Sequence, residues 1–256
     1  MIAAELDWAA LHTALEQADW ARAEAWWQAV SAADPASAEQ AAALALRLGR
    51  PRLATRWARE PLTSAAAWLR LGHPDEVQAA LGADPGPAGA DRTPPASARR
   101  SVLLARAAWQ RALLDPTAPG DPTPQATAAR QQARQEGDAG AIVAAAVLLA
   151  EIQLWGADPD PKLALRTLAE GLKVAELTGQ PADAALLAAL SHVQARVGSA
   201  AKAQRSAAKA LARSEARSPA RVLALLALGQ PTEAQAQASA GELAPLWWQV
   251  WSGQGP

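Results

Sequence analysis

The sequence predicts an all-α protein, and three observations support this fold class. Residues that favour helices, chiefly Ala, Leu, Arg, Glu and Gln, dominate a chain of 256 residues that is 50% hydrophobic. β-Branched residues are scarce, and no stretch alternates apolar and polar residues over the length of a strand. The pattern Leu-Gly-x-Pro recurs at 48–51, 71–74 and 228–231, with a looser copy, TGQP, at 178–181.

The repeated Leu-Gly-x-Pro pattern has a simple physical explanation. Glycine tolerates the left-handed backbone conformation that ends a helix. Proline is preset for the first turn of the next helix, where its missing N–H costs nothing. Each copy therefore predicts a helix end, a tight turn and a helix start. Repetition of the pattern predicts antiparallel helix pairs with short connections.

Gly and Pro residues cut the whole chain into short helical pieces. In chain order, we predict helices over residues 4–17, 20–32, 36–48, 51–59, 62–71, 74–81, 97–114, 124–136, 139–155, 160–178, 182–197, 199–216, 219–228, 231–240 and 242–252. Asp158 and Asp160 stand at the start of the helix predicted at 160–178, and a proline follows each of them. They suit a turn and an N-cap better than a pair of catalytic carboxylates.

Two segments rich in Pro and Gly interrupt this series, at 82–98 and 115–125. We predict exposed loops there, on either side of the helix at 97–114. The simplest organisation is a single helical-repeat domain over residues 1–256. In the alternative, residues 82–125 divide an N-terminal part, 1–81, from a C-terminal part, 126–256.

Small residues follow several turn glycines at regular offsets. Each set falls on one face of its predicted helix, where small side chains let two helices approach closely. These residues are Ala54 and Ala58 after Gly49, Ala203, Ala207 and Ala210 after Gly198, and Ala234 and Ala238 after Gly229. The interval from Gly198 to Gly229 is close to the period of a helix-hairpin repeat.

In these features the sequence resembles the tetratricopeptide repeat (TPR) family. The best match is the stretch 181–211, with Leu187 and Leu190 at inward positions of a first helix and Gly198 at the turn. The first hairpin, 18–35, has Ala23, Trp27 and Pro35 at similar offsets. The resemblance covers about half of the chain. It implies a right-handed α-solenoid of antiparallel helix hairpins whose first helices line a concave groove.

The resemblance also suggests binding residues. Arg47, Arg70 and Arg196 each stand two residues before a turn glycine, a position that looks towards the groove in a TPR first helix. Arginine pairs with carboxylates, so these residues would suit an acidic peptide or the C-terminal carboxylate of a partner protein. His192 would share a helix face with Arg196. In the alternative, each arginine only complements the carbonyl groups at its helix C-terminus.

Few residues in the sequence suit catalysis. Cysteine is absent, which excludes disulfides, thiolate catalysis, iron–sulfur clusters and cysteine-bound zinc. His12, His73 and His192 form no metal-binding pair, and no phosphate-binding loop, dinucleotide fingerprint or nucleophile elbow is present. We therefore expect a protein that is not an enzyme and that holds no metal or cofactor.

From the N-terminal residues and the hydropathy pattern we expect a cytoplasmic protein. The N-terminal residues do not form a secretory signal. The longest apolar run, 141–150, is about half of the roughly 20 residues that a membrane span needs, so no contact with a membrane is expected.

A stripe of basic residues runs along the helix predicted at 199–216 and just past it. Its members are Lys202, Arg205, Lys209, Arg213 and Arg217. Such a stripe could neutralise nucleic-acid phosphates, although the net charge of the chain is −1. In the alternative it is a solvated convex face, because Ala203, Ala207 and Ala210 take the packing face.

The aromatic residues are unusual, because the chain has 11 Trp and no Phe or Tyr. Most of these Trp residues should fill core space that the many alanines leave open. The C-terminal cluster at 246–251 is different. Trp247 and Trp251 share one face of the helix predicted at 242–252, and Trp248 points elsewhere. Either this helix caps the last hydrophobic groove, or it forms a homodimer or partner contact.

Together these observations favour a non-enzymatic scaffold or adaptor that binds a protein or acidic peptide in the groove of a TPR-like solenoid. The alternative is a helical-repeat regulator that binds nucleic acid through the basic region 196–221.

Overall fold

The fold was analysed in a computed structural model that describes residues 7–31, 34–82, 97–115, 117 and 120–252. Within these residues the chain forms 14 α-helices and one short 3₁₀ helix. They are α1 (Trp8–Gln17), α2 (Trp20–Ser31), α3 (Pro35–Arg47), α4 (Pro51–Trp57), α5 (Pro61–Leu71), α6 (Pro74–Gly82), α7 (Ala98–Leu114), α8 (Thr123–Glu136), α9 (Ala139–Trp155), α10 (Pro161–Leu177), α11 (Ala184–Arg196), α12 (Ala200–Arg213), α13 (Pro219–Ala227), α14 (Pro231–Ala240) and η1 (Pro245–Trp247). The predicted all-α fold class is confirmed.

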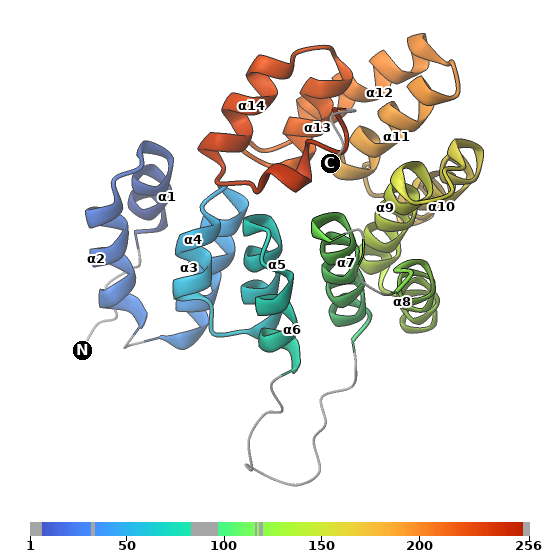
Figure 1. Ribbon diagram of the computed structural model, residues 1–256. Coiled ribbons are helices and arrows are strands. Elements are labelled where there is room, and N and C mark those ends of the chain that lie inside the picture. The colour runs from blue at the N-terminus through green and yellow to red at the C-terminus, as the bar shows by residue number, and fades with distance from the viewer. Residues whose placement is uncertain (1–6, 32–33, 83–96, 116, 118–119, 253–256) are drawn as a thin grey trace, which may run out of the picture.

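The helices pack as consecutive antiparallel pairs, from α1 and α2 to α13 and α14 (Figure 1). Each helix contacts the next one along the chain. The first helices of neighbouring pairs, from α3 to α13, also contact one another in series. They form an inner layer, as expected for an array of helix hairpins.

The predicted turns are present and have the expected backbone. Gly49, Gly72, Gly179 and Gly229 all adopt left-handed conformations, with φ between 65° and 76°. The predicted N-cap is also confirmed, because the Asp160 carboxylate accepts hydrogen bonds from the backbone N–H groups of Lys162 and Leu163.

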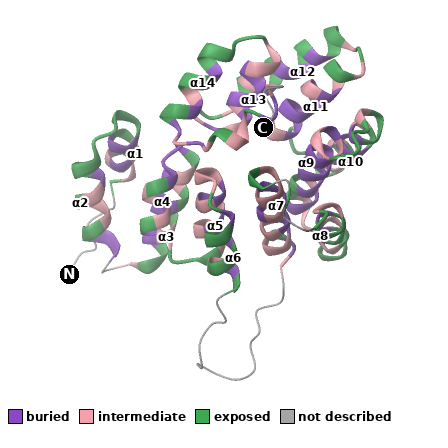
Figure 2. Ribbon diagram, in the orientation of Figure 1, coloured by how far each residue is buried: buried purple, intermediate pink, exposed green. Residues whose placement is uncertain are grey.

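The small residues that follow the turns lie in the helix interfaces, as predicted. Ala54, Ala203, Ala207, Ala210, Ala234 and Ala238 are all buried, whereas Ala58 follows the end of α4 and is half-buried. Figure 2 shows such buried residues on the inward faces of the helices along the whole array. The small residues therefore let α4, α12 and α14 pack closely against their neighbours.

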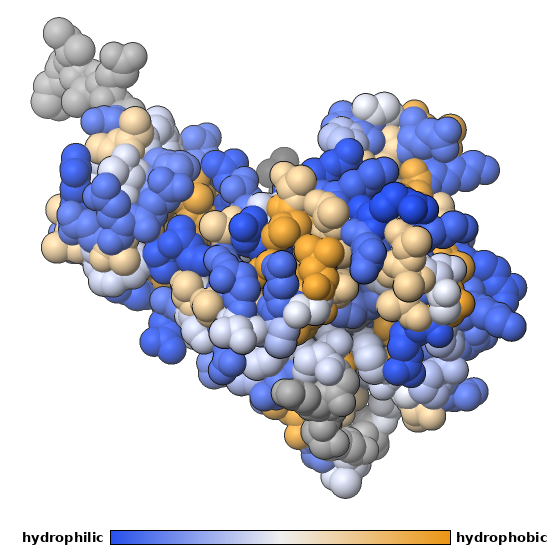
Figure 3. All heavy atoms as spheres, turned by 90° about the horizontal axis from the view of Figure 1, so that it is seen from above, coloured by the Kyte–Doolittle hydropathy of each residue, from blue (hydrophilic) through white to orange (hydrophobic). Residues whose placement is uncertain are grey.

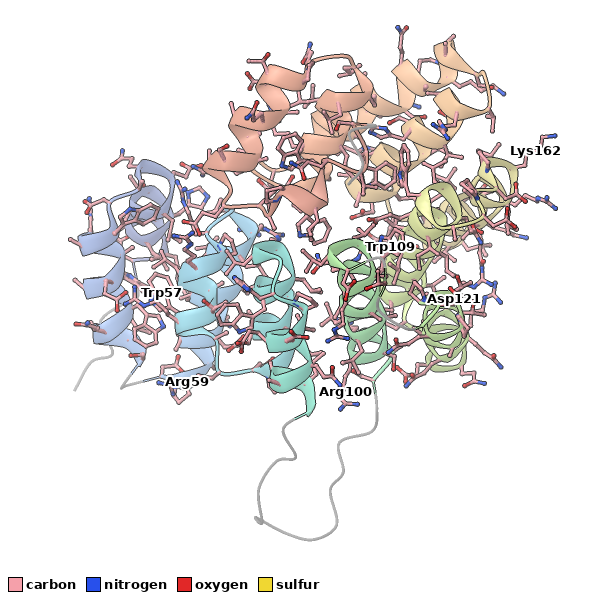
Figure 4. The ribbon with its side chains drawn as sticks, in the orientation of Figure 1. Trp57, Arg59, Arg100, Trp109, Asp121 and Lys162 are labelled. Carbon is pink, nitrogen blue, oxygen red and sulfur yellow. The ribbon has the colours of Figure 1, made fainter. Side chains whose placement is uncertain are left out.

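Tryptophan fills the core of the first two pairs. Trp57, which is labelled in Figure 4, is buried under α2 and α3. Its ring stacks on Trp27 with a centroid distance of 5.8 Å, and its indole N–H donates to Glu24. The prediction that most Trp residues act as core side chains is confirmed for Trp57, whereas Trp20, at the start of α2, is 41% exposed.

The array curves into an arc whose far end returns to its beginning (Figure 1). The side chain of Arg50, after the α3–α4 turn, donates to the carbonyl oxygen of Ala240 at the end of α14, at 3.0 Å. The backbone N–H of Ala244 donates to the carbonyl oxygen of Arg70 at the end of α5, at 2.9 Å. These bonds join residues about 170 to 190 positions apart, so the arc is closed by the protein itself.

The prediction of a helix over 242–252 is wrong. Helix α14 ends at Ala240, Glu242 has a left-handed backbone (φ 54°), and only a 3₁₀ turn and hydrogen-bonded turns follow. Pro245 has no N–H to donate, and the N–H of Ala244 is already bonded to Arg70. The segment therefore forms turns and follows the surface of the helices on which it lies.

The loop predicted at 82–98 lies mostly outside the described residues, as do residues 116 and 118–119 of the loop predicted at 115–125. On either side of the first gap, α6 and α7 contact each other. The guanidinium of Arg100, labelled in Figure 4, donates to the carbonyl oxygen of Leu81 with distances of 2.7 and 3.1 Å. In the described part of the protein, no helix is long and apolar enough to cross a membrane.

Candidate binding groove

A cavity of about 650 Å³ lies on the inner side of the arc. We call it the central groove. Helices α5, α7, α9, α11 and α13, the first helices of their pairs, all contribute to its walls, and the C-terminal turns close one side. Its wall residues include Leu69, Arg70, Arg106, Val143, Leu223 and Trp247. This volume is typical of pockets that bind ligands.

Most of the wall is apolar, because Ala, Val and Leu side chains of these helices face the groove. Seen from above in Figure 3, hydrophobic residues gather in the middle of the molecule and hydrophilic residues surround them. An apolar ligand binds favourably in a groove of this kind, because it displaces water from the apolar wall. The few polar groups in the wall must then determine which ligand is selected.

One polar group of the wall is a buried ion pair between α7 and α9. The Arg106 guanidinium lies 2.8 Å from Glu151, and these side chains are only 12% and 6% exposed. The other carboxylate oxygen of Glu151 accepts a hydrogen bond of 3.0 Å from the indole of Trp109, which lies between the same two helices (Figure 4). Both oxygens of Glu151 are thus engaged, and the pair adds no net charge to the groove.

Arg70, at the end of α5, is a wall residue whose charge no described carboxylate balances. Two other wall residues, Arg213 and Glu215, also lack an ion pair among the described residues. The Arg70 guanidinium donates a short hydrogen bond to the carbonyl oxygen of Leu46. Burial lowers the pKa of Arg70 to about 10, so the side chain is still protonated at neutral pH. A half-buried cation with only a carbonyl partner favours the arrival of an anion.

The three arginines of the predicted ladder are not brought into one cavity. Arg47 is exposed and lines a separate hollow of about 390 Å³ beside Trp8 and His12. Arg196 is also exposed, and its guanidinium lies 5.1 Å from the ring centre of Trp155. Only Arg70 of the three is in the wall of the central groove.

His192 lies behind the groove wall. Its Nε2 is 2.9 Å from the carbonyl oxygen of Leu223, and the ring of Trp251 covers it at a centroid distance of 4.9 Å. Burial lowers the pKa of His192, although the bond to Leu223 acts in the opposite direction. The neutral ring, with its Nε2–H donating to Leu223, thus links α11 to α13.

The predicted basic stripe is shorter than expected. Lys202, Arg205 and Lys209 are exposed on α12, outside the face of its buried alanines. Arg213, at the end of α12, is also exposed, but it lines the central groove and its guanidinium donates to the carbonyl oxygen of Ala182 at 2.9 Å. Arg217 does not belong to the stripe, because α12 ends at Arg213 and Arg217 has a left-handed backbone (φ 61°). The N–H of Arg217 donates to Gln237 of α14, so this residue is part of the α12–α13 connection.

The C-terminal tryptophans lie against the protein's own helices. Trp247 and Trp251 are in the wall of the central groove, and Trp251 is only 4% exposed. Trp248 packs instead on the cluster that contains Val222 and Leu225. A homodimer through these residues stays a prediction, and it would have to use the part of Trp247 and Trp248 that remains exposed.

Sequence reasoning did not single out Arg106 and Glu151. Arg106 and Trp109 have the i, i+3 spacing that puts them on one helix face, which is the only local signal. Their common partner Glu151 is on another helix pair, and no sequence pattern connects the two helices. Within the described residues, no cluster of three His, Cys, Asp or Glu side chains could hold a metal ion.

Comparison with known proteins assigns no family to the protein. The sequence matches no protein-family model, and no curated protein matches it. The function is therefore argued from the groove and its residues.

Proposed function

We propose that the protein is a non-enzymatic, cytoplasmic scaffold that binds a segment of another protein in the central groove. In this proposal the array is a TPR-like right-handed solenoid, and its first helices present the binding surface. The observation that carries the proposal is the pairing of an apolar groove with the unbalanced charge of Arg70. A segment with apolar side chains and one carboxylate matches both features.

The state of three titratable groups in or behind the groove wall supports binding rather than catalysis. Glu151 is held by Arg106 and Trp109, and Asp183 caps α11 by accepting hydrogen bonds from two backbone N–H groups. His192 is covered by Trp251. A general acid or base needs access to a substrate, and these three side chains are already engaged within the fold.

Affinity capture with matched arginine variants tests this proposal. The protein is used as bait in extracts of its native host, and captured proteins are quantified by mass spectrometry for wild type, Arg70→Gln, Arg47→Ala and Arg196→Ala. We expect Arg70→Gln to lose a partner about 30-fold or more, because removing one member of a buried charge pair costs at least about 2 kcal/mol.

Arg47 and Arg196 are the controls, since they occupy the same position before a turn glycine but lie outside the groove. Their variants should recover the partner at wild-type levels. Full recovery by a folded Arg70→Gln protein would overturn the proposal. An equal loss for all three variants would instead support the arginine ladder expected from the TPR resemblance.

Nucleic-acid binding through α12 is the second candidate function. Lys202, Arg205 and Lys209 are exposed, and none of them forms an ion pair with an acidic residue of the described part of the protein. Together with Arg213 they give one face of α12 the spacing and charge to follow a phosphate backbone. Binding to duplex DNA or RNA at about 50 mM salt, which weakens steeply as salt is added, would support this function. The absence of binding at that salt concentration would remove it.

A further inference from the structure

The C-terminal strap, residues 244–252, crosses the central groove without forming another helix pair. It consists of η1 and a series of backbone turns that end with the N–H of Ser252 donating to Trp248. The strap therefore differs from the helices on which it lies, because its position depends on contacts with the groove wall.

The first half of the strap binds the end of α5 and the middle of α7. The N–H of Ala244 donates to the carbonyl oxygen of Arg70 at 2.9 Å, and the indole N–H of Trp247 donates to the carbonyl oxygen of Leu69 at 2.7 Å. The Arg106 guanidinium lies 5.1 Å from the centre of the Trp247 ring. A hydrogen bond to a carbonyl at a helix end and a cation–π contact are interactions that a separate peptide could also make.

The second half of the strap places Trp251 between α9 and α11. Its ring meets Trp155 edge-on at a centroid distance of 6.0 Å and covers His192. Two aromatic side chains four residues apart thus fill two adjacent positions of the groove wall. Tryptophan in a pocket of this kind is a frequent energetic centre of protein interfaces.

The strap leaves polar atoms beside both positions unsatisfied. Gln110 donates to the carbonyl oxygen of Leu69, but its own buried side-chain oxygen has no hydrogen-bond partner among the described residues. The indole nitrogen of Trp155, next to Trp251, has no partner there either. A buried donor or acceptor without a partner is unfavourable, so an occupant that also bonds to these atoms would bind better than the strap.

We infer that the strap is an internal occupant of the groove and that the partner displaces it with a segment that carries aromatic side chains. This inference rests on the proposed function and specifies the partner. One aromatic ring of the partner takes the position of Trp247, between the Leu69 carbonyl and Arg106, and another takes that of Trp251, beside Trp155. The strap, being part of the same molecule, competes at a high effective concentration and keeps weak ligands from these two positions.

A labelled peptide with the strap's own sequence, LAPLWWQVWS (residues 243–252), tests the inference. Its binding to the full-length protein is measured by fluorescence anisotropy. We expect weak binding to wild type and about 30-fold tighter binding to Trp247→Ala/Trp251→Ala, in which the internal competitor has lost both anchors. Ala244→Pro removes one strap hydrogen bond at a residue whose φ of −58° suits proline, and should tighten binding about threefold.

Two controls test whether any gain in peptide affinity depends on the groove. Trp248→Ala, which alters the strap outside the groove wall, should leave peptide binding within about twofold of wild type. A peptide with Ala in place of both groove tryptophans should bind none of the variants. Circular dichroism and urea unfolding establish that each variant is folded.

The inference is overturned if folded strap variants, Ala244→Pro included, bind the peptide no more tightly than wild type. That result would make the strap a permanent part of the fold, and the loss of partner in Arg70→Gln would still support the proposed function. Conversely, tighter peptide binding with unchanged partner capture by Arg70→Gln would support the strap inference and contradict the role of Arg70.

Discussion

The turn glycines of the third and the last helix pairs have the same backbone and different surroundings. Gly72, between α5 and α6, has a φ of 76°, and Gly229, between α13 and α14, has a φ of 73°. A Cβ atom added to Gly72 would lie 2.6 Å from the Cβ of Ala244, whereas one added to Gly229 would meet nothing within 4 Å. The sequence pattern is therefore the same at both turns, but only the N-terminal turn is covered.

Gly49, between α3 and α4, extends this comparison. Its added Cβ would lie 2.6 Å from the Cβ of Arg217, in the connection between α12 and α13. Both N-terminal turns are thus covered by C-terminal residues, one by the strap and one by the Arg217 connection. Glycine thus forms the turn at all three places, and at Gly49 and Gly72 it also makes room for closure of the arc.

The largest expected effect is a difference in unfolding free energy among the alanine variants of these three glycines. Alanine at any of the three costs about 1–2 kcal/mol of unfolding free energy, because an L-residue is strained in the left-handed region. At Gly49 and Gly72 the collision adds about 1–3 kcal/mol, since the neighbours are tightly packed. Urea unfolding of Gly49→Ala, Gly72→Ala and Gly229→Ala measures the difference. Equal losses at all three positions would mean that the N-terminal turns are not covered.

A smaller loss is expected when the closure bonds of Arg50 are removed. This side chain is 7% exposed and donates to the carbonyl oxygens of Leu15 and Ala240, at 3.1 and 3.0 Å. Arg50→Met keeps the apolar part of the side chain but leaves two carbonyl groups without a partner, which should cost about 1–3 kcal/mol. Unfolding free energy measured in urea checks this value, and an unchanged midpoint would contradict the bond to Ala240.

A pH effect is expected from His192, which lies under the strap. Its folded-state pKa is below the ordinary value of 6.5, so folding favours the neutral ring. The stability contributed by this neutral ring is fully present above about pH 6.5 and is lost as the pH falls through the lower, folded-state pKa. In His192→Gln, which keeps a donor for Leu223, unfolding free energy should fall less between pH 7 and pH 5. An identical pH dependence in wild type and variant would contradict the buried position of the ring.

The smallest effect is expected at Arg52, two residues after Arg50. It forms an ion pair with Glu242 at 3.8 Å, but its side chain is 77% exposed. Exposed pairs contribute little, so Arg52→Met should change the unfolding free energy by less than about 0.5 kcal/mol. Arg52→Met is therefore the matched control for Arg50→Met. A loss at Arg52 as large as that at Arg50 would show that overall charge, and not the buried bonds, holds the arc closed.

Local features of the fold could be predicted from the sequence because short-range chemistry determines them. Glycine and proline mark the turns, and small residues mark the helix faces that pack closely. Closure of the arc could not be predicted in this way. It depends on contacts such as that between Ala244 and Gly72, and no local pattern specifies them. The same closure explains why residues 242–252 fold as turns although their tryptophan spacing suits a helix.

The candidate site was predictable only in part for the same reason. Arg47, Arg70 and Arg196 have equivalent places in the sequence pattern, yet only Arg70 lines the central groove. Which helix ends face the groove depends on the curvature and closure of the whole array. The pair of Arg106 and Glu151 was missed because its members come from different helix pairs.

The most direct test of closure is a double-mutant cycle between Gly72 and Ala244, followed by urea unfolding. Ala244→Gly removes the methyl group that a side chain at position 72 would strike, and the next atom, on Leu246, lies at an ordinary distance of 3.7 Å. Gly72→Ala should therefore cost at least about 1 kcal/mol less in the Ala244→Gly background than in wild type, whereas Gly229→Ala should cost the same in both. If Gly72→Ala costs the same in both backgrounds, the strap does not lie on the α5–α6 turn, and the closed arc is wrong.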